Sequence, residues 1–261
     1  MMYRKKISII TINFNNADGL EQTIKSVINQ TYKEFEYIII DGGSTDNSVE
    51  KMNSYSDFIT YSISEKDEGI YNAMNKGLKE ANGEYLLFLN SGDSLINDTI
   101  LQEVMEAGLN HDLVYGDLLF FNEEKEWEWV LPEKLTFSYF YKFSIAHPST
   151  FIKSKLFQQF GPYDENLKIV SDWKFFLLVT TKYNCSYKHL DKIISKYNFF
   201  GLSSNPGSLS LIEQERYHVL KQEFPLFYKD YEELFQVKSE MKKISYFIKT
   251  RRIIKKLLNQ K

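Results

Sequence analysis

The chain has 261 residues, of which 43% are hydrophobic and 26% are charged, with a net charge of −3. This composition suits one large or two small globular domains and excludes wholesale disorder, while the net charge gives no overall attraction to nucleic acid. The single cysteine, Cys185, excludes an internal disulfide and a cysteine-rich zinc site. With no signal pattern at Met1–Lys6 and no apolar run of about 18 residues, we expect a cytoplasmic protein.

The first half of the chain alternates strand-like and helix-like segments. Strands are expected at residues 6–14, 35–41, 58–64 and 84–90. Helices are expected at residues 20–30, 70–82 and from about 98, with another beginning at 44–47. Strands that alternate with helices of this length predict right-handed βαβ units and an α/β fold with a mainly parallel sheet. After about residue 120 this alternation ends.

Polar residues follow three of the expected strands. They are Asn13-Phe14-Asn15, Asp41-Gly42-Gly43 and Asn90-Ser91-Gly92-Asp93. Any one of these clusters is explained by turn formation alone. Ligands of open α/β sheets bind outside the carboxyl ends of the strands, so the three clusters together predict one crevice.

Four segments carry a family resemblance in their order along the chain: "SIITINFNN", "YIIIDGGSTDNS", "SEKDEGIYNAMNKG" and "GEYLLFLNSGDSL". The combination resembles the family 2 glycosyltransferases over most of residues 6–200, and is similar to the branch that assembles bacterial colanic acid, capsule and O-antigen. The resemblance implies a GT-A (Rossmann-like) fold, a nucleotide-sugar donor, a divalent metal and inversion at the anomeric carbon.

The resemblance places the nucleotide at the ends of the first two strands. Asp41 matches the residue that reads the base, and Gly42-Gly43 lets the backbone approach a ligand closely. The alternative for Asp41 is a turn cap. Thr11 and Asn13 match the other nucleotide contacts. For Ser44 we expect a structural role as a helix N-cap.

The charged run before "GIYNAMNKG" contains two further candidates. By the resemblance, Asp67 and Lys76 face the donor, and a lysine is a suitable point charge beside a diphosphate. The alternative is that both are ordinary surface residues.

Asp93 is the predicted ligand of Mg²⁺ or Mn²⁺. Mg²⁺ sites often combine one or two carboxylates with substrate phosphates and water. The family usually has two or three acidic residues in this turn, whereas here the earlier positions are Asn90 and Gly92. Asp93 therefore remains as the charged ligand, and Asn90 is expected to contact the donor.

The segment "IVSDWKFFL" supplies Asp172 as the predicted catalytic base. An inverting transfer needs a base opposite the leaving group to deprotonate the attacking hydroxyl. The alternative is a first-turn aspartate that complements the helix dipole. By the resemblance His147 lies near the acceptor, and Trp173 either lines the sugar site or packs in the core.

The C-terminal segment 238–261 combines lysines and arginines with apolar residues near helical spacing. The pattern predicts a basic amphipathic helix that binds a membrane surface or a partner helix, or that packs on the domain. Membrane contact would suit a polyprenyl-diphosphate-linked acceptor and a peripheral location on the inner face of the plasma membrane. No stacking motif accompanies the charge, so a nucleic-acid partner is not expected. The apolar residues are Ile244, Phe247, Ile248, Ile253, Ile254, Leu257 and Leu258.

These observations predict a GT-A domain at residues 1–205, with a nucleotide-binding half at about 1–117 and an acceptor half at about 118–205. A loop near 202–210 precedes a helical, basic extension at 206–261. The expected function is inverting transfer of a sugar from a nucleotide-sugar donor, expected to be a UDP-sugar, to a saccharide or lipid-linked acceptor in bacterial cell-surface polysaccharide synthesis. The alternatives are a nucleotidyltransferase and a non-catalytic nucleotide-sugar-binding protein.

Overall fold

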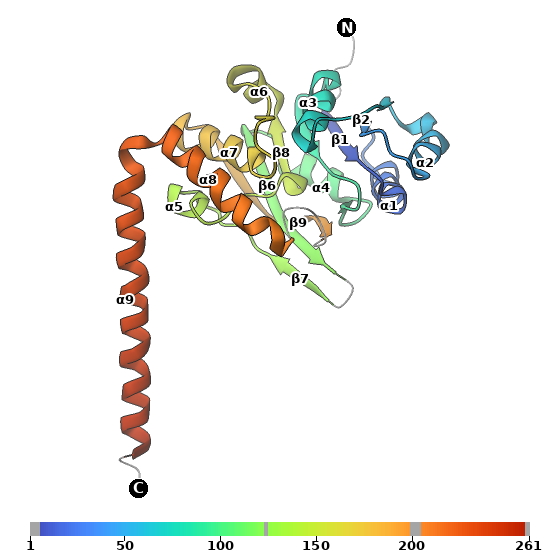
Figure 1. Ribbon diagram of the computed structural model, residues 1–261. Coiled ribbons are helices and arrows are strands. Elements are labelled where there is room, and N and C mark those ends of the chain that lie inside the picture. Colours follow the sequence, from blue (N-terminus) through green and yellow to red (C-terminus); the bar gives the residue numbers. More distant parts are fainter. Residues whose placement is uncertain (1–5, 123–124, 199–204, 259–261) are drawn as a thin grey trace. The chain divides into compact units, whose positions relative to one another are not determined.

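The computed structural model describes residues 6–122, 125–198 and 205–258 (Figure 1). Contacts within the chain divide it into two units, Met1–Ile212 and Glu213–Lys261. The boundary falls inside helix α8 (Leu209–Glu223). Part of the loop that the sequence predicts near 202–210 lies outside the described residues.

The first half of the central sheet is parallel. Its strands, in spatial order, are β3 (Tyr61–Ser64), β2 (Phe35–Asp41), β1 (Ile7–Asn13) and β4 (Tyr85–Phe88). All three neighbouring pairs run parallel, as the alternation of strands and helices predicts. The α/β fold class is therefore confirmed, and β2 has the predicted bounds.

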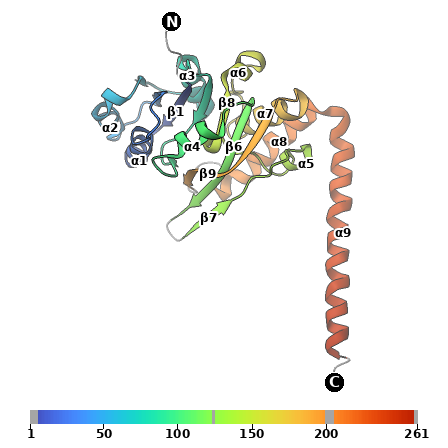
Figure 2. The ribbon, with the colours of Figure 1, turned by 180° about the vertical axis from the view of Figure 1, so that it is seen from behind.

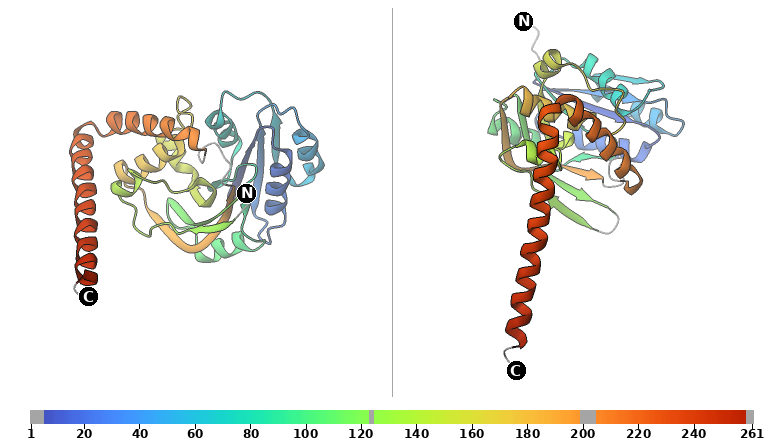
Figure 3. Two further views of the ribbon diagram at one scale, coloured as in Figure 1. Left: turned by 60° about the horizontal axis from the view of Figure 1, so that its bottom comes forward. Right: turned by 60° about the vertical axis from the view of Figure 1, so that its left-hand side comes forward.

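The second half of the sheet is mixed. It continues from β4 through β8 (Thr150–Lys153), β6 (Leu113–Phe121), β9 (Tyr187–Asn198) and β5 (Ser94–Leu95), with β7 (Glu126–Trp129) paired to β6. Strand β8 is antiparallel to both β4 and β6, whereas β6 and β9 are parallel. We expected parallel pairing for most of the sheet. In the described residues it holds throughout the first half, and in the second half only between β6 and β9. Figure 3 shows the sheet curling from β1 and β2 toward β6 and β9.

Helices cover both faces of the parallel half (Figures 1 and 2). Helices α1 (Ala17–Ile28), α2 (Ser48–Ser54) and α4 (Ile100–Ala107) share one buried cluster with alternate residues of β1, β2 and β4. Helix α3 (Ile70–Glu80) packs on the opposite face, where a Cβ at Gly77 would lie 2.5 Å from Ile10 Cγ2. Side chains alternate across a strand, so these fully buried strands are apolar on both faces.

The remaining helices lie beyond about residue 120, where the regular alternation of strands and helices ends. They are α5 (Phe137–Phe140), α6 (Ser154–Phe160), α7 (Ser171–Leu177) with a π-helical turn at Leu178–Lys182, α8, and α9 (Pro225–Leu258). Short 3₁₀ turns lie at Ser56–Phe58, His147–Ser149 and Pro206–Ser208. In the described part of the chain, no helix combines the length and apolarity that a bilayer-spanning segment needs.

Candidate active site

The polar turns of the first half meet at one edge of the sheet. Strand β1 lies between β2 and β4, and Asn13 at the end of β1 pairs with Asp41 at the end of β2. The turn after β4 is tied to β1, because the Ser91 backbone N–H donates to the Ile12 carbonyl at 3.0 Å. The predicted convergence of the three strand ends is therefore confirmed.

Asp41 is fully buried and accepts hydrogen bonds on both carboxylate oxygens. The donors are Asn13 Nδ2 at 2.7 Å, the Ser44 N–H at 2.9 Å, and the Ser44 and Ser64 hydroxyls at 2.6 Å each. Burial raises the pKa of Asp41, but these hydrogen bonds, led by those from Ser44, outweigh it and hold the pKa below its usual value. Asp41 is therefore ionised at neutral pH, and its hydrogen bonds fix its position.

Ser44 donates hydrogen bonds to Asp41 and does not cap a helix. Helix α2 begins at Ser48, with Asn47 at its N-cap position and no capping hydrogen bond from that side chain. The predicted capping role of Ser44 is wrong, because the buried carboxylate of Asp41 takes its hydroxyl and N–H.

Thr11 and Asn13 are likewise engaged inside the protein. Thr11 is fully buried, its hydroxyl donates to the Leu89 carbonyl at 2.7 Å, and it lies 3.0 Å from the Tyr37 hydroxyl. Asn13 donates to Asp41, while its Oδ1 is buried with no hydrogen-bond partner among the described residues. Asn13 Oδ1 is thus a buried acceptor without a partner in the described part of the chain, whereas the Thr11 hydroxyl links β1 to the residue that follows β4.

Asp67 and Lys76 pair with each other near Gly42, which follows β2. Lys76 Nζ lies 2.6 Å from Asp67 Oδ1 and 2.7 Å from Glu65 Oε1. A Cβ at Gly42 would lie 3.0 Å from Asp67 Oδ2 and 3.2 Å from the ring of Phe14. Phe14 itself is 65% exposed. Phe14 lies between Asn13 and Asn15 at the end of β1, and this position could have marked its ring as a candidate ligand contact. The sequence motifs did not single it out.

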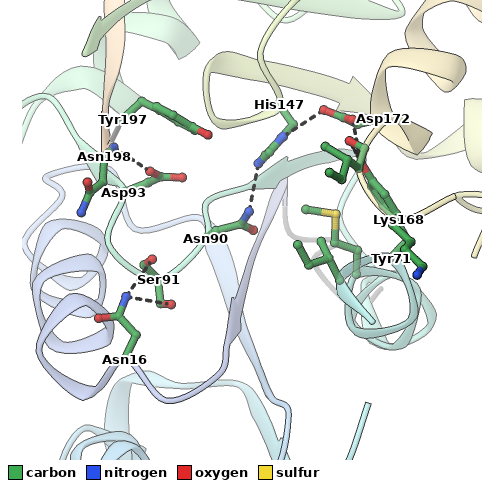
Figure 4. Close-up of a pocket in the computed structure, with 13 residues that line it drawn as sticks. Asn16, Tyr71, Asn90, Ser91, Asp93, His147, Lys168, Asp172, Tyr197 and Asn198 are labelled. Carbon is green, nitrogen blue, oxygen red and sulfur yellow. Dashed lines mark hydrogen bonds and ion pairs between the residues drawn. The ribbon is translucent and has the colours of Figure 1, made fainter. Parts of the chain in front are cut away.

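A cavity of about 340 Å³ lies next to the turn after β4. Figure 4 shows the side chains that surround it. Of the predicted site residues, Asn90, Asp93, His147 and Asp172 line this cavity. The other lining residues are Asn16, Ile70, Tyr71, Met74, Ser91, Lys168, Ile169, Tyr197 and Asn198.

Asp93 lies at one side of this cavity, where hydrogen bonds from Thr23 and Asn198 hold it in place. The Thr23 hydroxyl lies 2.6 Å from the Asp93 carbonyl, to which it donates, and accepts from the Gly92 N–H at 3.0 Å. The carboxylate accepts from the Asn198 N–H at 3.1 Å and is 4% exposed. Burial raises the pKa of Asp93 to about 7, against a smaller opposing effect of His147.

Asp172 lies at the start of α7, on the other side of the cavity. Its Oδ1 accepts from the Tyr71 hydroxyl at 2.8 Å, and its Oδ2 lies 3.3 Å from His147 Nδ1. Burial raises the pKa of Asp172, but the contacts with His147 and Tyr71 outweigh it and leave the pKa below its usual value. The carboxylate is therefore ionised at neutral pH, the form that a general base needs.

Trp173, beside Asp172, packs in the core. It is 1% exposed, its indole N–H donates to the Phe140 carbonyl at 2.7 Å, and it does not line the cavity. The structure therefore shows the packing alternative and not the sugar-lining one. This anchoring fixes the first turn of α7 and with it the direction of Asp172.

His147 bridges the two sides of the cavity. Its Nε2 lies 3.1 Å from Asn90 Nδ2, while its Nδ1 faces Asp172. Asn90, His147, Asp172 and Tyr71 thus form a continuous polar row (Figure 4). Tyr71 lies within a motif quoted from the sequence, but no local pattern singled it out, because its partners are about a hundred residues away.

The metal prediction rests on Asp93. The described residues contain no group of three or more His, Cys, Asp or Glu side chains that could hold a metal ion. The chemistry of Asp93 nevertheless fits a cation shared with a diphosphate, because its raised pKa shows that the protein leaves the buried negative charge undercompensated.

Comparison with known proteins identifies the family. Residues 8–162 match the sequence profile described as "Glycosyl transferase family 2". The chain belongs to glycosyl transferase family 2. The predicted family is therefore confirmed, and the protein is a glycosyltransferase.

Relatives carry glycosyltransferase names. A PGL/p-HBAD biosynthesis glycosyltransferase of Mycobacterium bovis is 31% identical over 205 residues, which are 76% of this chain and 78% of that protein. A cholesterol galactosyltransferase of Borreliella burgdorferi is 36% identical over 104 residues, which are 39% of this chain and 29% of that protein.

Solved structures of glycosyltransferases share the fold of this family 2 transferase. S. aureus TarS 1–349, solved in complex with UDP, superposes with a TM-score of 0.61 at 20% identity, over 74% of this chain and 60% of that one. The mannosyltransferase PcManGT from Pyrobaculum calidifontis, in complex with GDP-Man and Mn²⁺, gives 0.56 at 15%, over 75% of this chain and 57% of that one. The chain spans less than two thirds of these structures, and the likeness establishes the GT-A fold.

Proposed function

We propose that this protein is an inverting glycosyltransferase that moves a sugar from a UDP-sugar to a hydroxyl of a saccharide or lipid-linked acceptor. The observation that carries the proposal is one cavity with two carboxylates, Asp93 and Asp172, on opposite sides of Asn90 and His147 (Figure 4). Two opposed acidic groups suit a single displacement, in which the diphosphate leaves on one side and the acceptor attacks from the other.

The nucleotide is proposed to lie across the ends of β1 and β2. Asn13 and Asp41 would supply polar contacts for the base and ribose, and the exposed ring of Phe14 would supply a stacking face. Gly42 leaves room for the ligand where a Cβ would approach Asp67 and Phe14. Asp67 and Lys76 remain proposed donor contacts, and binding would require their ion pair to be shared with the ligand.

The reacting end of the donor is proposed to occupy the cavity. Asp93 would hold Mg²⁺ or Mn²⁺ together with the diphosphate, and the bound ion would supply Lewis-acid stabilisation of the leaving group. Asp172 would take the proton from the acceptor hydroxyl at its carboxylate oxygen. Tyr71 and His147 orient that carboxylate, and His147 also remains a proposed acceptor contact. Together these side chains place the base and the leaving group on different walls.

The acceptor and pathway are proposed from the kind of relatives found. The names of the mycobacterial relatives refer to PGL/p-HBAD biosynthesis, and the TarS fragment has been solved with UDP-GlcNAc. A role in cell-surface polysaccharide synthesis on a polyprenyl-diphosphate-linked acceptor is consistent with the exposed apolar residues and lysines of α9. Peripheral association with the inner face of the plasma membrane would follow from that acceptor.

Asp172→Asn tests the assignment of the base. The amide keeps the size of the side chain but cannot accept the proton, so we expect kcat to fall by about 10²–10⁴-fold. UDP-sugar affinity should change little, because the base acts on the acceptor. Both quantities should be measured on the same preparation, together with the anomeric configuration of the product. Near-normal turnover or retained configuration would contradict the proposal.

Metal removal tests the assignment of Asp93. We expect EDTA to abolish transfer and Mg²⁺ or Mn²⁺ to restore it. Asp93→Asn should raise the metal concentration needed for half-maximal activity, because an amide carries no charge to attract the ion. Transfer that continues undiminished in EDTA would show that basic side chains stabilise the leaving diphosphate instead.

A further inference from the structure

An aromatic side chain reaches into the cavity from strand β9. Tyr197 lies one residue before the end of this strand and lines the cavity. Figure 4 shows its half-buried ring extending from the strand in the direction of His147. Neither the proposed nucleotide contacts nor the proposed proton transfer uses this ring. The ring nevertheless borders the space in which the sugar is proposed to be transferred.

Three more aromatic rings form a continuous row with Tyr197. Phe120 of β6 is the register partner of Tyr197, and the two ring centroids are 5.4 Å apart in an edge-to-face arrangement. The Phe120 ring also stacks with Trp127 and Trp129 of β7, at 5.5 and 5.3 Å between centroids. Cross-strand partners share one face of a sheet, and each aromatic pair contributes beyond simple burial. The row therefore restricts the orientations that the Tyr197 ring can take.

Strand β9 also joins Tyr197 to the turn that carries His147. The Ser195 hydroxyl, two residues before Tyr197, donates to the Pro148 carbonyl at 2.8 Å, and Pro148 directly follows His147. His147 is a proposed acceptor contact, and it lies beside the proposed base. In the strand order, β6 and β9 lie on the opposite side of β4 from β1 and β2, where the nucleotide is proposed to bind. The wall formed by β6 and β9 is therefore available to the acceptor.

We propose that the Tyr197 ring is the surface on which a sugar ring of the acceptor packs, and that the row of Phe120, Trp127 and Trp129 holds it there. This inference rests on the proposed function, and it narrows the acceptor to one whose reacting hydroxyl belongs to a sugar. One face of a pyranose ring carries C–H groups that pack on the electron-rich face of an aromatic ring, while its hydroxyls project from the edge. Such packing would bury apolar area at Tyr197 and still leave a hydroxyl exposed to Asp172.

Saturation-transfer NMR with irradiation of the aromatic protons tests the contact. The probes are maltotetraose, cellotetraose, chitotetraose and mannotetraose, each added to the full chain with UDP and Mg²⁺. We expect the C–H protons of the tightest-binding probe to receive saturation. Tyr197→Leu keeps an apolar side chain but no ring, so it should remove this transfer and weaken binding of the probe about three- to tenfold. Tyr197→Phe keeps the ring and should preserve both.

A second pair of variants tests the supporting row. Trp129 is half-buried on β7, and Trp129→Leu should weaken binding of the same probe about threefold, whereas Trp129→Phe should retain it. Calorimetry with UDP, and with the tighter-binding of UDP-GlcNAc and UDP-glucose, shows whether each variant keeps the donor site. We expect both donor affinities to stay unchanged. The matched control is Phe58→Leu, at a ring that is 60% exposed and does not line the cavity, and it should change no affinity.

The outcomes separate this inference from the proposed function. Equal saccharide binding by Tyr197→Leu and the unmodified protein would overturn the inference, as would the absence of binding by all four probes. A loss of UDP-sugar affinity in Tyr197→Leu with unchanged UDP affinity would place the ring at the donor's sugar, and would overturn it as well. Failure of the unmodified protein to bind UDP, UDP-GlcNAc or UDP-glucose would instead overturn the proposed function.

Discussion

At the scale of single residues, the two carboxylates of the cavity have pKa values shifted in opposite directions. Asp93 is buried with little compensation, and its pKa is raised to about 7. Asp172 is also shielded, but hydrogen bonds to its ionised form keep its pKa below the usual value. Environments that push two acids apart are typical of sites where each acid has a different task. Here the undercompensated acid suits a cation, and the compensated one suits proton transfer.

His147 makes the largest contribution to the low pKa of Asp172, and Tyr71→Phe tests the smaller contribution of the Tyr71 hydroxyl. The Tyr71 hydroxyl is shared between Asp172 Oδ1 at 2.8 Å and the Ile169 carbonyl at 2.5 Å. Removing it takes a donor from the ionised carboxylate, so the pKa of Asp172 should rise. The acid limb of the kcat/KM profile should therefore move to higher pH.

The control for this prediction is Tyr163→Phe. The Tyr163 hydroxyl is buried, and it has no hydrogen-bond partner among the described residues, while its ring packs 5.6 Å from that of Tyr71. The acid limb should stay in place in this variant. An unchanged limb in Tyr71→Phe, or an equal shift in both variants, would show that the phenol does not set the pKa of Asp172.

At the scale of elements, helix α1 shapes the turn that carries Asp93. Thr23, on the buried side of α1, reaches the Asp93 carbonyl and the Gly92 N–H. Gly92 has a φ of +97°, in the range that favours glycine. Asn16, the N-cap of the same helix, donates to the Ser91 carbonyl at 3.2 Å. The helix therefore supplies the hydrogen bonds that this irregular turn cannot make within itself.

Thr23→Val tests this support of the turn. Valine has nearly the shape of threonine but no hydroxyl, so the Asp93 carbonyl and the Gly92 N–H would lose a partner. We expect the free energy of unfolding to fall by about 1–3 kcal/mol, the cost of leaving a buried polar group unpaired. Thermal or urea denaturation measures it. Ser54→Ala, at an exposed serine of α2, should change it by less than about 0.5 kcal/mol. Equal stabilities would contradict a supporting role of Thr23.

At the scale of the whole molecule, the catalytic unit and the C-terminal helix have different surfaces. Every residue that lines the cavity lies in the unit Met1–Ile212. Helix α9 exposes apolar side chains at Met241, Ile244, Phe247 and Ile248, next to exposed lysines. Residues 253, 254, 257 and 258 of the predicted apolar set belong to α9, but their side chains lie outside the described part. Binding of this helix to a membrane surface stays a prediction.

Deletion of residues 225–261 tests this prediction. UDP affinity should be unchanged, because the lining residues are retained. Binding to vesicles that contain anionic lipid should be lost, and in the full chain it should weaken as salt rises, because lysines attract the anionic surface. Flotation assays measure the bound fraction. A matched variant, Lys242→Glu with Lys243→Glu, should reduce binding without shortening the chain. Vesicle binding that survives both changes would exclude α9 as the contact.

The sequence by itself determined the parallel half of the sheet and the residues at its edge. Apolar strands and amphipathic helices alternate regularly up to about residue 120, and strand polarity then dictates that Asn13, Asp41 and Asn90 follow strands at the same edge. Asp93 and Asp172 were found because short motifs around them resemble a family. Local pattern suffices for such features, since each depends on residues near in sequence.

Tertiary structure alone decided how these residues are used. The burial that raises the pKa of Asp93 comes from packing around the turn, and His147 contacts Asn90 and Asp172, which are 57 and 25 residues away in the sequence. The mixed second half of the sheet and the buried position of Trp173 likewise depend on long-range pairing. Hydrogen bonds and desolvation act through space, so residue spacing along the chain does not encode them.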